Sequence, residues 1–103
     1  MEGQTWAYLV PGTVKNLADI EKLIQCESQG VNVSRPDSDG IISDGILQFH
    51  RGGTWQEMSR LSGIKGSPIN PPDAIRMADF MISHGFLGRW TCAHILGLVP
   101  VDK

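Results

Sequence analysis

The stretch from Leu17 to Ser28 constrains the fold most, because its apolar residues have the spacing of a helix that buries one face. These apolar residues are Leu17, Ile20, Leu23 and Ile24. Glu27 follows Ile24 by three positions and Leu23 by four, so a helix places its carboxyl group at the end of the buried face. Loss of water on one side raises the pKa of a carboxyl group. The sequence therefore predicts that Glu27 is a proton donor near neutral pH, as a general acid must be.

Three further helices are predicted along the chain. Residues 54–62 form one, the proline pair Pro71-Pro72 opens the next, which runs to His84, and residues 88–96 form a short last one. The helix after the proline pair has the cleanest apolar face, made of Ala74, Ile75, Ala78, Met81 and Ile82. Residues 1–15 lack a helical period. We therefore expect an extended arm over residues 1–15 and a single domain over residues 16–103.

Capping residues predict where the helices begin and end. Asn16 can cap the first helix with Asp19 as its partner, and Gly30 can end that helix. Thr54 and Glu57 have the spacing of a capping box at the start of the second helix.

The segment between the first two helices is rich in turn formers. Residues 31–33 and 41–42 are expected to form a short irregular hairpin across residues 36–40. Asp37 and Asp39 have a faint similarity to a calcium loop, but the further ligands and the terminal Glu of that motif are absent. The three histidines also lack metal-ligand spacing, and structural roles are expected for His50, His84 and His94. We therefore expect no metal and no cofactor.

An apolar stretch, Gly45-Ile46-Leu47-Gln48-Phe49, follows the predicted hairpin and contains one polar side chain. Gln48 is either an amide tied to the backbone or a donor that points into a cleft.

Composition excludes several classes of function. The net charge of −2 with mixed signs provides no basic stripe, which argues against nucleic acid as a partner. No apolar run approaches the roughly 20 residues of a membrane span. Cys26 and Cys92 are either two free thiols, as in the cytosol, or one disulfide, as in an oxidising compartment. The first residues lack the features of a secretory signal, so we expect either a removed signal or another export route.

Four segments together resemble the lysozyme-like superfamily, most closely the catalytic domains of resuscitation-promoting factors and, behind them, the slt-type lytic transglycosylases. They are Glu27-Ser28-x-Gly30, Gly45-Ile46-Leu47-Gln48-Phe49, Thr54-Trp55 and Trp90-Thr91-Cys92-Ala93. The resemblance covers about residues 16–97. It implies a mainly α, α+β fold of about four helices around a catalytic cleft, with a small irregular β or loop lobe, and we expect a monomer.

The resemblance also implies an activity. Glu27 would be the catalytic acid in cleavage of the β-1,4 bond between N-acetylmuramic acid and N-acetylglucosamine in peptidoglycan. Gln48 would orient the glycan beside it. Thr54 would be the small polar residue at the cleft and Trp55 its packing partner, both on the substrate side, and Asp39 is a further substrate-binding candidate. Cys26 would pair with Cys92 as in the family, which places the protein outside the cytoplasm.

A second catalytic carboxylate has three candidates in the sequence. Asp44 is the preferred candidate because it directly precedes the apolar stretch, ahead of Asp37 and Asp39, although a turn-capping role is the simpler interpretation. With a second acid across the cleft, water would be activated and the bond hydrolysed. Without one, Glu27 would act alone and the 6-hydroxyl would close a 1,6-anhydro sugar.

The chain also departs from the family. Its loop between Glu27 and Gln48 is longer and lacks the family's aromatic residues. One alternative is therefore a catalytically inactive module on the same scaffold that binds glycan or protein. A third interpretation, a small helical interaction protein of the cytosol, requires both cysteines to be reduced.

Overall fold

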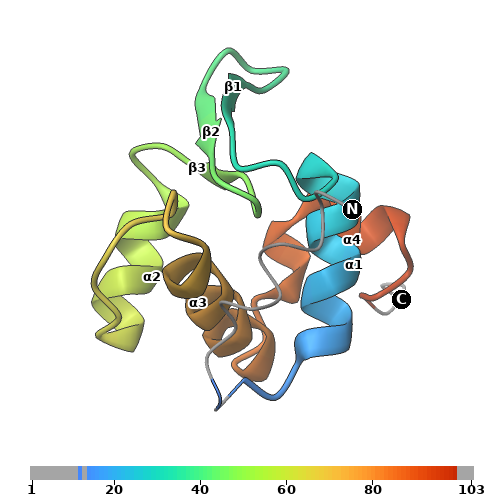
Figure 1. Ribbon diagram of the computed structural model, residues 1–103, viewed down its shortest axis with the longest axis vertical. Helices are drawn as coiled ribbons and strands as arrows, with labels where there is room; N and C mark the ends of the chain where they lie inside the picture. The colour runs from blue at the N-terminus through green and yellow to red at the C-terminus, as the bar shows by residue number, and fades with distance from the viewer. Residues whose placement is uncertain (1–11, 13, 100–103) are drawn as a thin grey trace.

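Helices form the body of the molecule and a small sheet lies at one end of it (Figure 1). The computed structural model describes residue 12 and residues 14–99. Its four α-helices are α1 (Leu17–Ser28), α2 (Thr54–Ser62), α3 (Pro71–Ser83) and α4 (Thr91–Ile95), with a 3-10 helix, η2 (Leu87–Arg89), before α4. The strands β1 (Ser34–Pro36), β2 (Ile42–Asp44) and β3 (Phe49–His50) form an antiparallel sheet in the order β1-β2-β3.

The predicted α+β organisation is confirmed at this level. The radius of gyration of 12.7 Å is that of one small folded domain. Most of the predicted N-terminal arm, residues 1–11 and 13, lies outside the described residues. Within the described ranges, every helix falls short of the length and hydropathy that a bilayer-crossing segment needs.

The core joins the apolar faces of α1 and α3 to the stretch after β2. Ile20, Leu23 and Ile24 of α1 are all buried, as the spacing predicts. The core also contains buried residues of α3 and of the stretch after β2, which are Ala74, Ile75, Met77, Ala78, Met81, Ile46, Leu47 and Phe49. Buried residues of α2 and of the α4 region complete it, and they are Trp55, Met58, Trp90, Cys92 and Ala93. Glu27 therefore stands at the end of a helix whose apolar face is packed, so its position is held by the core.

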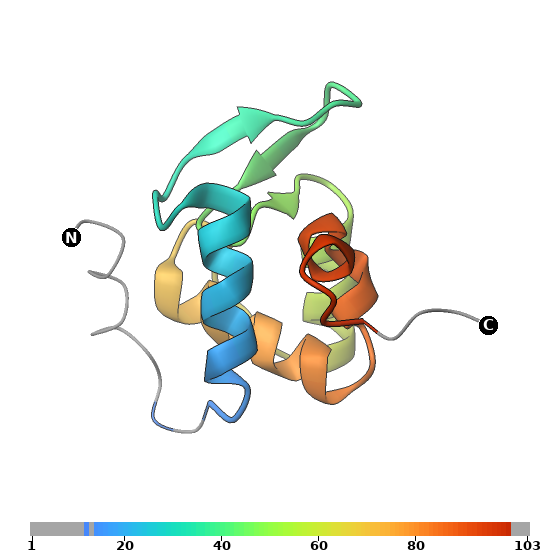
Figure 2. The ribbon, with the colours of Figure 1, turned by 90° about the vertical axis from the view of Figure 1, so that its right-hand side faces the viewer.

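A hairpin is present as β1 and β2, but its first strand is Ser34–Pro36 rather than the predicted residues 31–33, and its second strand is Ile42–Asp44 rather than residues 41–42. Ser34 pairs with Asp44 and Pro36 with Ile42, and the chain reverses between Asp37 and Gly40. Figure 2 shows that the hairpin starts at the C-terminal end of α1 and extends on the side where α4 lies.

The predicted caps of α1 are correct only in part. Asn16 occupies the N-cap position, but its side chain forms no capping bond, and the C-cap lies one residue before Gly30. The Nδ2 of Asn16 instead donates to Asp79 Oδ1 of α3 at 2.8 Å. The backbone N–H of Asn16 donates to the same oxygen at 2.9 Å. At the other end, Gln29 rather than Gly30 is the left-handed C-cap, with φ of 53°.

The predicted capping box of α2 is wrong. Thr54 is the first helical residue, Gly53 occupies the cap position, and no side chain caps the helix. Glu57 instead accepts two hydrogen bonds from Arg89, each of 3.0 Å. The last predicted helix is interrupted, because Trp90 is extended between η2 and α4 (ψ of 126°).

Candidate functional site

Glu27 lies in the last turn of α1 and is partly buried. Burial raises the pKa of its carboxyl group from 4.5 to about 7. Two neighbours modify this effect: the backbone N–H of Cys92 lowers the pKa, and the negative charge of Asp37 raises it. The predicted raised pKa is confirmed, so a substantial fraction of Glu27 carries its proton at neutral pH. Its catalytic role stays a prediction.

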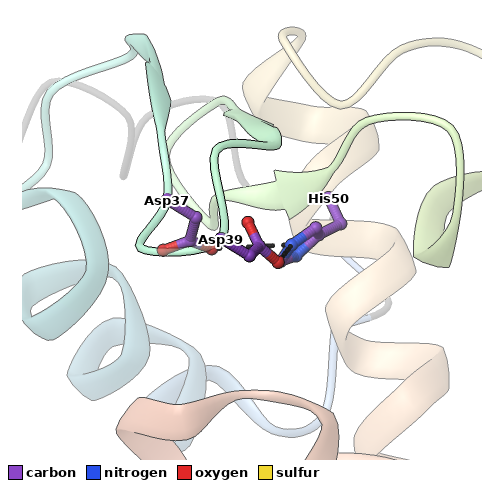
Figure 3. A group of neighbouring side chains, drawn as sticks. All are labelled: Asp37, Asp39 and His50. Atoms are coloured by element: carbon purple, nitrogen blue, oxygen red, sulfur yellow. Dashed lines mark hydrogen bonds and ion pairs between the residues drawn. The ribbon is translucent and has the colours of Figure 1, made fainter.

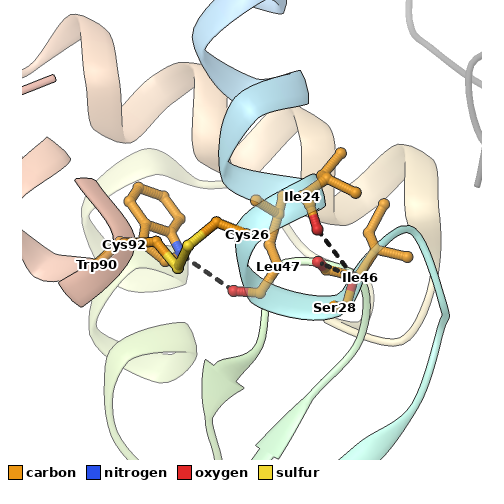
Figure 4. The surroundings of a disulfide bond; sticks show 7 residues. All are labelled: Ile24, Cys26, Ser28, Ile46, Leu47, Trp90 and Cys92. Carbon is orange, nitrogen blue, oxygen red and sulfur yellow. Dashed lines mark hydrogen bonds between the residues drawn. A yellow bond between two sulfur atoms is a disulfide. The ribbon is translucent and has the colours of Figure 1, made fainter. Parts of the chain in front are cut away.

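The residues on both sides of Glu27 are tied to other parts of the chain (Figure 4). Cys26 forms a disulfide with Cys92, with an S–S distance of 2.05 Å, which joins α1 to α4 and confirms the pairing that the resemblance implied. Ser28 is fully buried, and its Oγ donates to the carbonyl oxygen of Ile46 at 2.8 Å. The acid is therefore fixed by a covalent bond on one side and a buried hydrogen bond on the other, which limits its displacement.

The same stretch that receives the Ser28 bond also contacts the start of α4. Trp90 donates its indole Nε1–H to the carbonyl oxygen of Leu47 at 3.0 Å (Figure 4). The ring of Phe49 packs against Trp90 at 5.7 Å and edge-on against Trp55 at 5.1 Å, measured between ring centroids. Trp55 is 6% exposed, so little of its ring surface is open to a ligand.

Gln48 has its amide group directed at the backbone. Its Nε2 donates to the carbonyl oxygens of Val33, at 2.9 Å, and Gly45, at 2.8 Å. Its φ of 52° lies in the left-handed region, which a non-glycine residue occupies at a cost. Of the two interpretations of Gln48, the structure favours the one in which the amide nitrogen closes a turn. Only its side-chain oxygen is left to face a ligand.

A small pocket brings Gln48 and Thr54 together. Its volume is about 30 Å³, with Gln48, His50, Thr54 and Arg89 as polar lining residues and Phe49, Met81 and Trp90 as apolar ones. This volume accommodates water molecules and no sugar ring.

Asp44 is occupied by structural contacts. It is 5% exposed, and its Oδ1 accepts hydrogen bonds from Ser34 Oγ at 2.6 Å and Arg51 Nη2 at 2.8 Å. Its Oδ2 accepts from Arg51 Nε at 3.2 Å. The hydrogen bonds from Arg51 lower the pKa of Asp44. These bonds join β1, β2 and the end of β3, and they favour a structural role over that of a second acid.

Asp37, at the turn of the hairpin, is the carboxylate whose charge reaches Glu27. Its Oδ2 accepts a hydrogen bond from Ser43 Oγ at 3.1 Å, and half of its side chain is exposed. Asp39 and His50 lie beside it (Figure 3). Asp39 Oδ2 is 3.0 Å from His50 Nε2, and hydrogen bonds from the Ile41 N–H and from His50 lower the pKa of Asp39.

The structure thus brings together only part of the predicted site. Gln48 and Thr54 share a pocket with His50, and His50 contacts Asp39. Trp55 and Asp44 are buried in structural roles. Comparisons of the chain with protein-family models, curated proteins and solved structures give no match.

Proposed function

We propose that this protein has a lysozyme-like scaffold and cleaves the β-1,4 bond between N-acetylmuramic acid and N-acetylglucosamine in peptidoglycan. The observation that carries the proposal is the partly buried Glu27, whose pKa of about 7 suits proton donation to a leaving oxygen. The disulfide is consistent with an extracytoplasmic site of action and speaks against the cytosolic alternative, which requires reduced cysteines.

Glu27 would act first as an acid. It transfers its proton to the glycosidic oxygen, and the sugar left behind takes on oxocarbenium-ion character. The carboxylate that forms faces the backbone N–H of Cys92, which stabilises the charged form. The same residue can then accept a proton, because its pKa lies close to neutral pH.

Asp37 replaces Asp44 as the proposed second carboxylate. Its charge acts on Glu27, its side chain is half exposed, and one of its oxygens accepts a bond from Ser43, which orients the group. Asp44, in contrast, has both oxygens engaged by Arg51. Asp37 would hold the attacking water in a hydrolytic reaction. In a transglycosylase reaction the 6-hydroxyl of the substrate takes the place of that water.

The test is clearance of purified peptidoglycan followed by mass spectrometry of the products. Glu27→Gln should lower the rate by about 10²-fold or more, since it removes the proton donor. Glu21→Gln, on the exposed side of the same helix, is the matched control and should retain the rate. Unchanged turnover in folded Glu27→Gln would refute the proposal.

The products and the Asp37→Asn variant separate the two reactions. Reducing ends that disappear with Asp37→Asn indicate hydrolysis in which Asp37 holds the attacking water. Anhydro ends that persist in Asp37→Asn indicate transglycosylation by Glu27 alone.

The second candidate function is a catalytically inactive binding module. It is favoured by the contacts of Gln48, because the amide nitrogen of Gln48 donates its hydrogen bonds to backbone carbonyl oxygens and not to a glycan. Sedimentation with insoluble peptidoglycan, without release of soluble fragments, would support this alternative.

A further inference from the structure

Three potential metal ligands converge at the tip of the β1–β2 hairpin (Figure 3). Asp37 and Asp39 come from the turn between the strands, and His50 comes from the end of β3. One ligand atom of each lies within 4.8 Å of the others. His50 Nε2 is 3.0 Å from Asp39 Oδ2 and 3.7 Å from Asp37 Oδ2. Residues that the sequence keeps apart are therefore neighbours in the fold.

These distances fit a small tetrahedral ion. Zn²⁺ binds imidazole nitrogen and carboxylate oxygen at about 2.0–2.2 Å, so two of its ligand atoms stand about 3.4 Å apart. The two distances from His50 Nε2, 3.0 and 3.7 Å, lie on either side of this value. Each differs from it by a few tenths of an ångström, and the ligand atoms of Asp37 and Asp39 lie within 4.8 Å of each other. The side chains are partly exposed, which leaves room for water as the fourth ligand.

The chemistry of the three groups selects among ions. Ca²⁺ and Mg²⁺ prefer oxygen ligands and higher coordination numbers. One imidazole with two carboxylates suits Zn²⁺ and its transition-metal neighbours better. The nitrogen of His50 therefore distinguishes this site from an ordinary pair of exposed acidic side chains.

Neighbouring groups orient the carboxylates. The N–H of Ile41 donates to Asp39 Oδ1 at 2.9 Å, while the other oxygen, Oδ2, lies against His50. Ser43 Oγ donates to Asp37 Oδ2 at 3.1 Å, and the N–H of Asp37 donates to the Ile41 carbonyl at 2.8 Å. Hydrogen bonds of this kind hold ligands in position around protein-bound metals. Over residues 14–99, both carboxylates pair with His50 and neither forms an ion pair with lysine or arginine.

We propose that Asp37, Asp39 and His50 bind one Zn²⁺ ion at the tip of the hairpin. The binding itself is independent of the proposed enzymatic function. A consequence for the reaction rests on that function: a bound ion engages the carboxylate of Asp37 and removes it from its role beside Glu27. Zinc would then slow cleavage of peptidoglycan.

Isothermal titration of the full chain with ZnCl₂ tests the binding. We expect one ion per chain, and His50→Ala and Asp39→Asn should each weaken binding by about 10-fold or more. His84→Ala is the matched control, because the exposed His84 ring contacts Phe80 and His84 is not one of the three converging ligands. Circular dichroism confirms that each variant is folded.

Three outcomes would contradict the proposed zinc site. They are absence of zinc binding to the wild type, equal affinity in folded His50→Ala, and binding of CaCl₂ as tight as that of ZnCl₂. The last result would mean that the acidic pair alone attracts cations.

The effect on activity is read as the ratio of clearance rates with and without ZnCl₂. This ratio should fall well below one for the wild type and stay near one for His50→Ala. If zinc binds but no peptidoglycan is cleared, the proposed enzymatic function fails and the metal site stands. If peptidoglycan is cleared but zinc does not bind, the metal site fails and the enzyme stands.

Discussion

Replacing Glu27 by Gln is expected to stabilise the protein at alkaline pH and to leave its stability unchanged at acid pH. Folding raises the pKa of Glu27 from 4.5 to about 7, mainly because burial removes water from the carboxyl group. The folded state therefore binds this proton more tightly than the unfolded chain does. The free energy of unfolding falls as pH rises between these two pKa values, and the loss is complete above the higher one.

The size of this effect follows from the two pKa values. The change from 4.5 to about 7 corresponds to about 3 kcal/mol of unfolding free energy. The side chain is only partly buried, and solvent screening reduces this value to about 2 kcal/mol. In a domain of this size, 1 kcal/mol shifts Tm by roughly 4–8 °C. Glu27→Gln should therefore melt about 8 °C or more above the wild type at pH 8.

Thermal unfolding followed by circular dichroism at pH 4 and pH 8 measures the difference. Glu21→Gln makes the same chemical change on the exposed side of α1 and serves as the control. The reasoning is refuted if Glu27→Gln and the wild type have the same Tm at pH 8. It is also refuted if the difference in Tm between the two proteins is the same at pH 4 and at pH 8. A stabilised but inactive variant would indicate that the acid is kept for function at a cost in stability.

Three further variants test the contacts that hold the site. Replacing both Cys26 and Cys92 with Ser should lower the free energy of unfolding by about 4 kcal/mol in urea titrations, because the bridge closes 66 positions of chain; an unchanged midpoint would contradict this. Ser28→Ala leaves the carbonyl that its buried hydroxyl contacts without a partner and should cost about 1–3 kcal/mol, measured in the same way. Asp44→Asn weakens the contact with Arg51 and should cost about 2 kcal/mol at pH 7. Because folding lowers the pKa of Asp44, this last difference should shrink as pH falls through that pKa, and a difference independent of pH would contradict the ion pair.

The helices were the most predictable part of the fold. The apolar spacing of α1 and α3 is a local signal, and it identifies most of the buried residues of both helices. It misses Met77, which is fully buried, and it includes Leu17 and Ile82, which are only partly buried. The bounds of α2 follow from Gly63, whose φ of 76° suits the C-cap position. Apolar spacing and a C-cap glycine depend only on residues that are close together in the sequence, so a sequence pattern is enough to predict the helices.

The helix caps were less predictable because partners distant in sequence compete for the same side chains. Asn16 has the residue type of a cap, but Asp79 lies close to it and takes its amide. Glu57 has the spacing of a capping box, but Arg89 offers it a bidentate ion pair. Both partners come from later helices, and no local pattern contains them.

The site itself was predictable for Glu27 and less so for the carboxylates around it. The apolar stripe of α1 is enough to place Glu27 at a buried helix end. The contact between Asp44 and Arg51 could have been found, since a hairpin that pairs Asp44 with Phe49 brings Arg51 nearby. The approach of His50 to Asp39 depends on how β3 pairs with β2, and spacing in the sequence does not determine this register.

Titration of the Glu27 side chain by carbon-13 NMR tests the central claim most directly. The claim is that burial at the end of α1 keeps a proton on this carboxyl group near neutral pH. The account predicts a midpoint of about 7 for the Glu27 Cδ resonance. A midpoint near the ordinary value of 4.5 would contradict it, because the group would then be fully ionised at neutral pH and could not act as the acid.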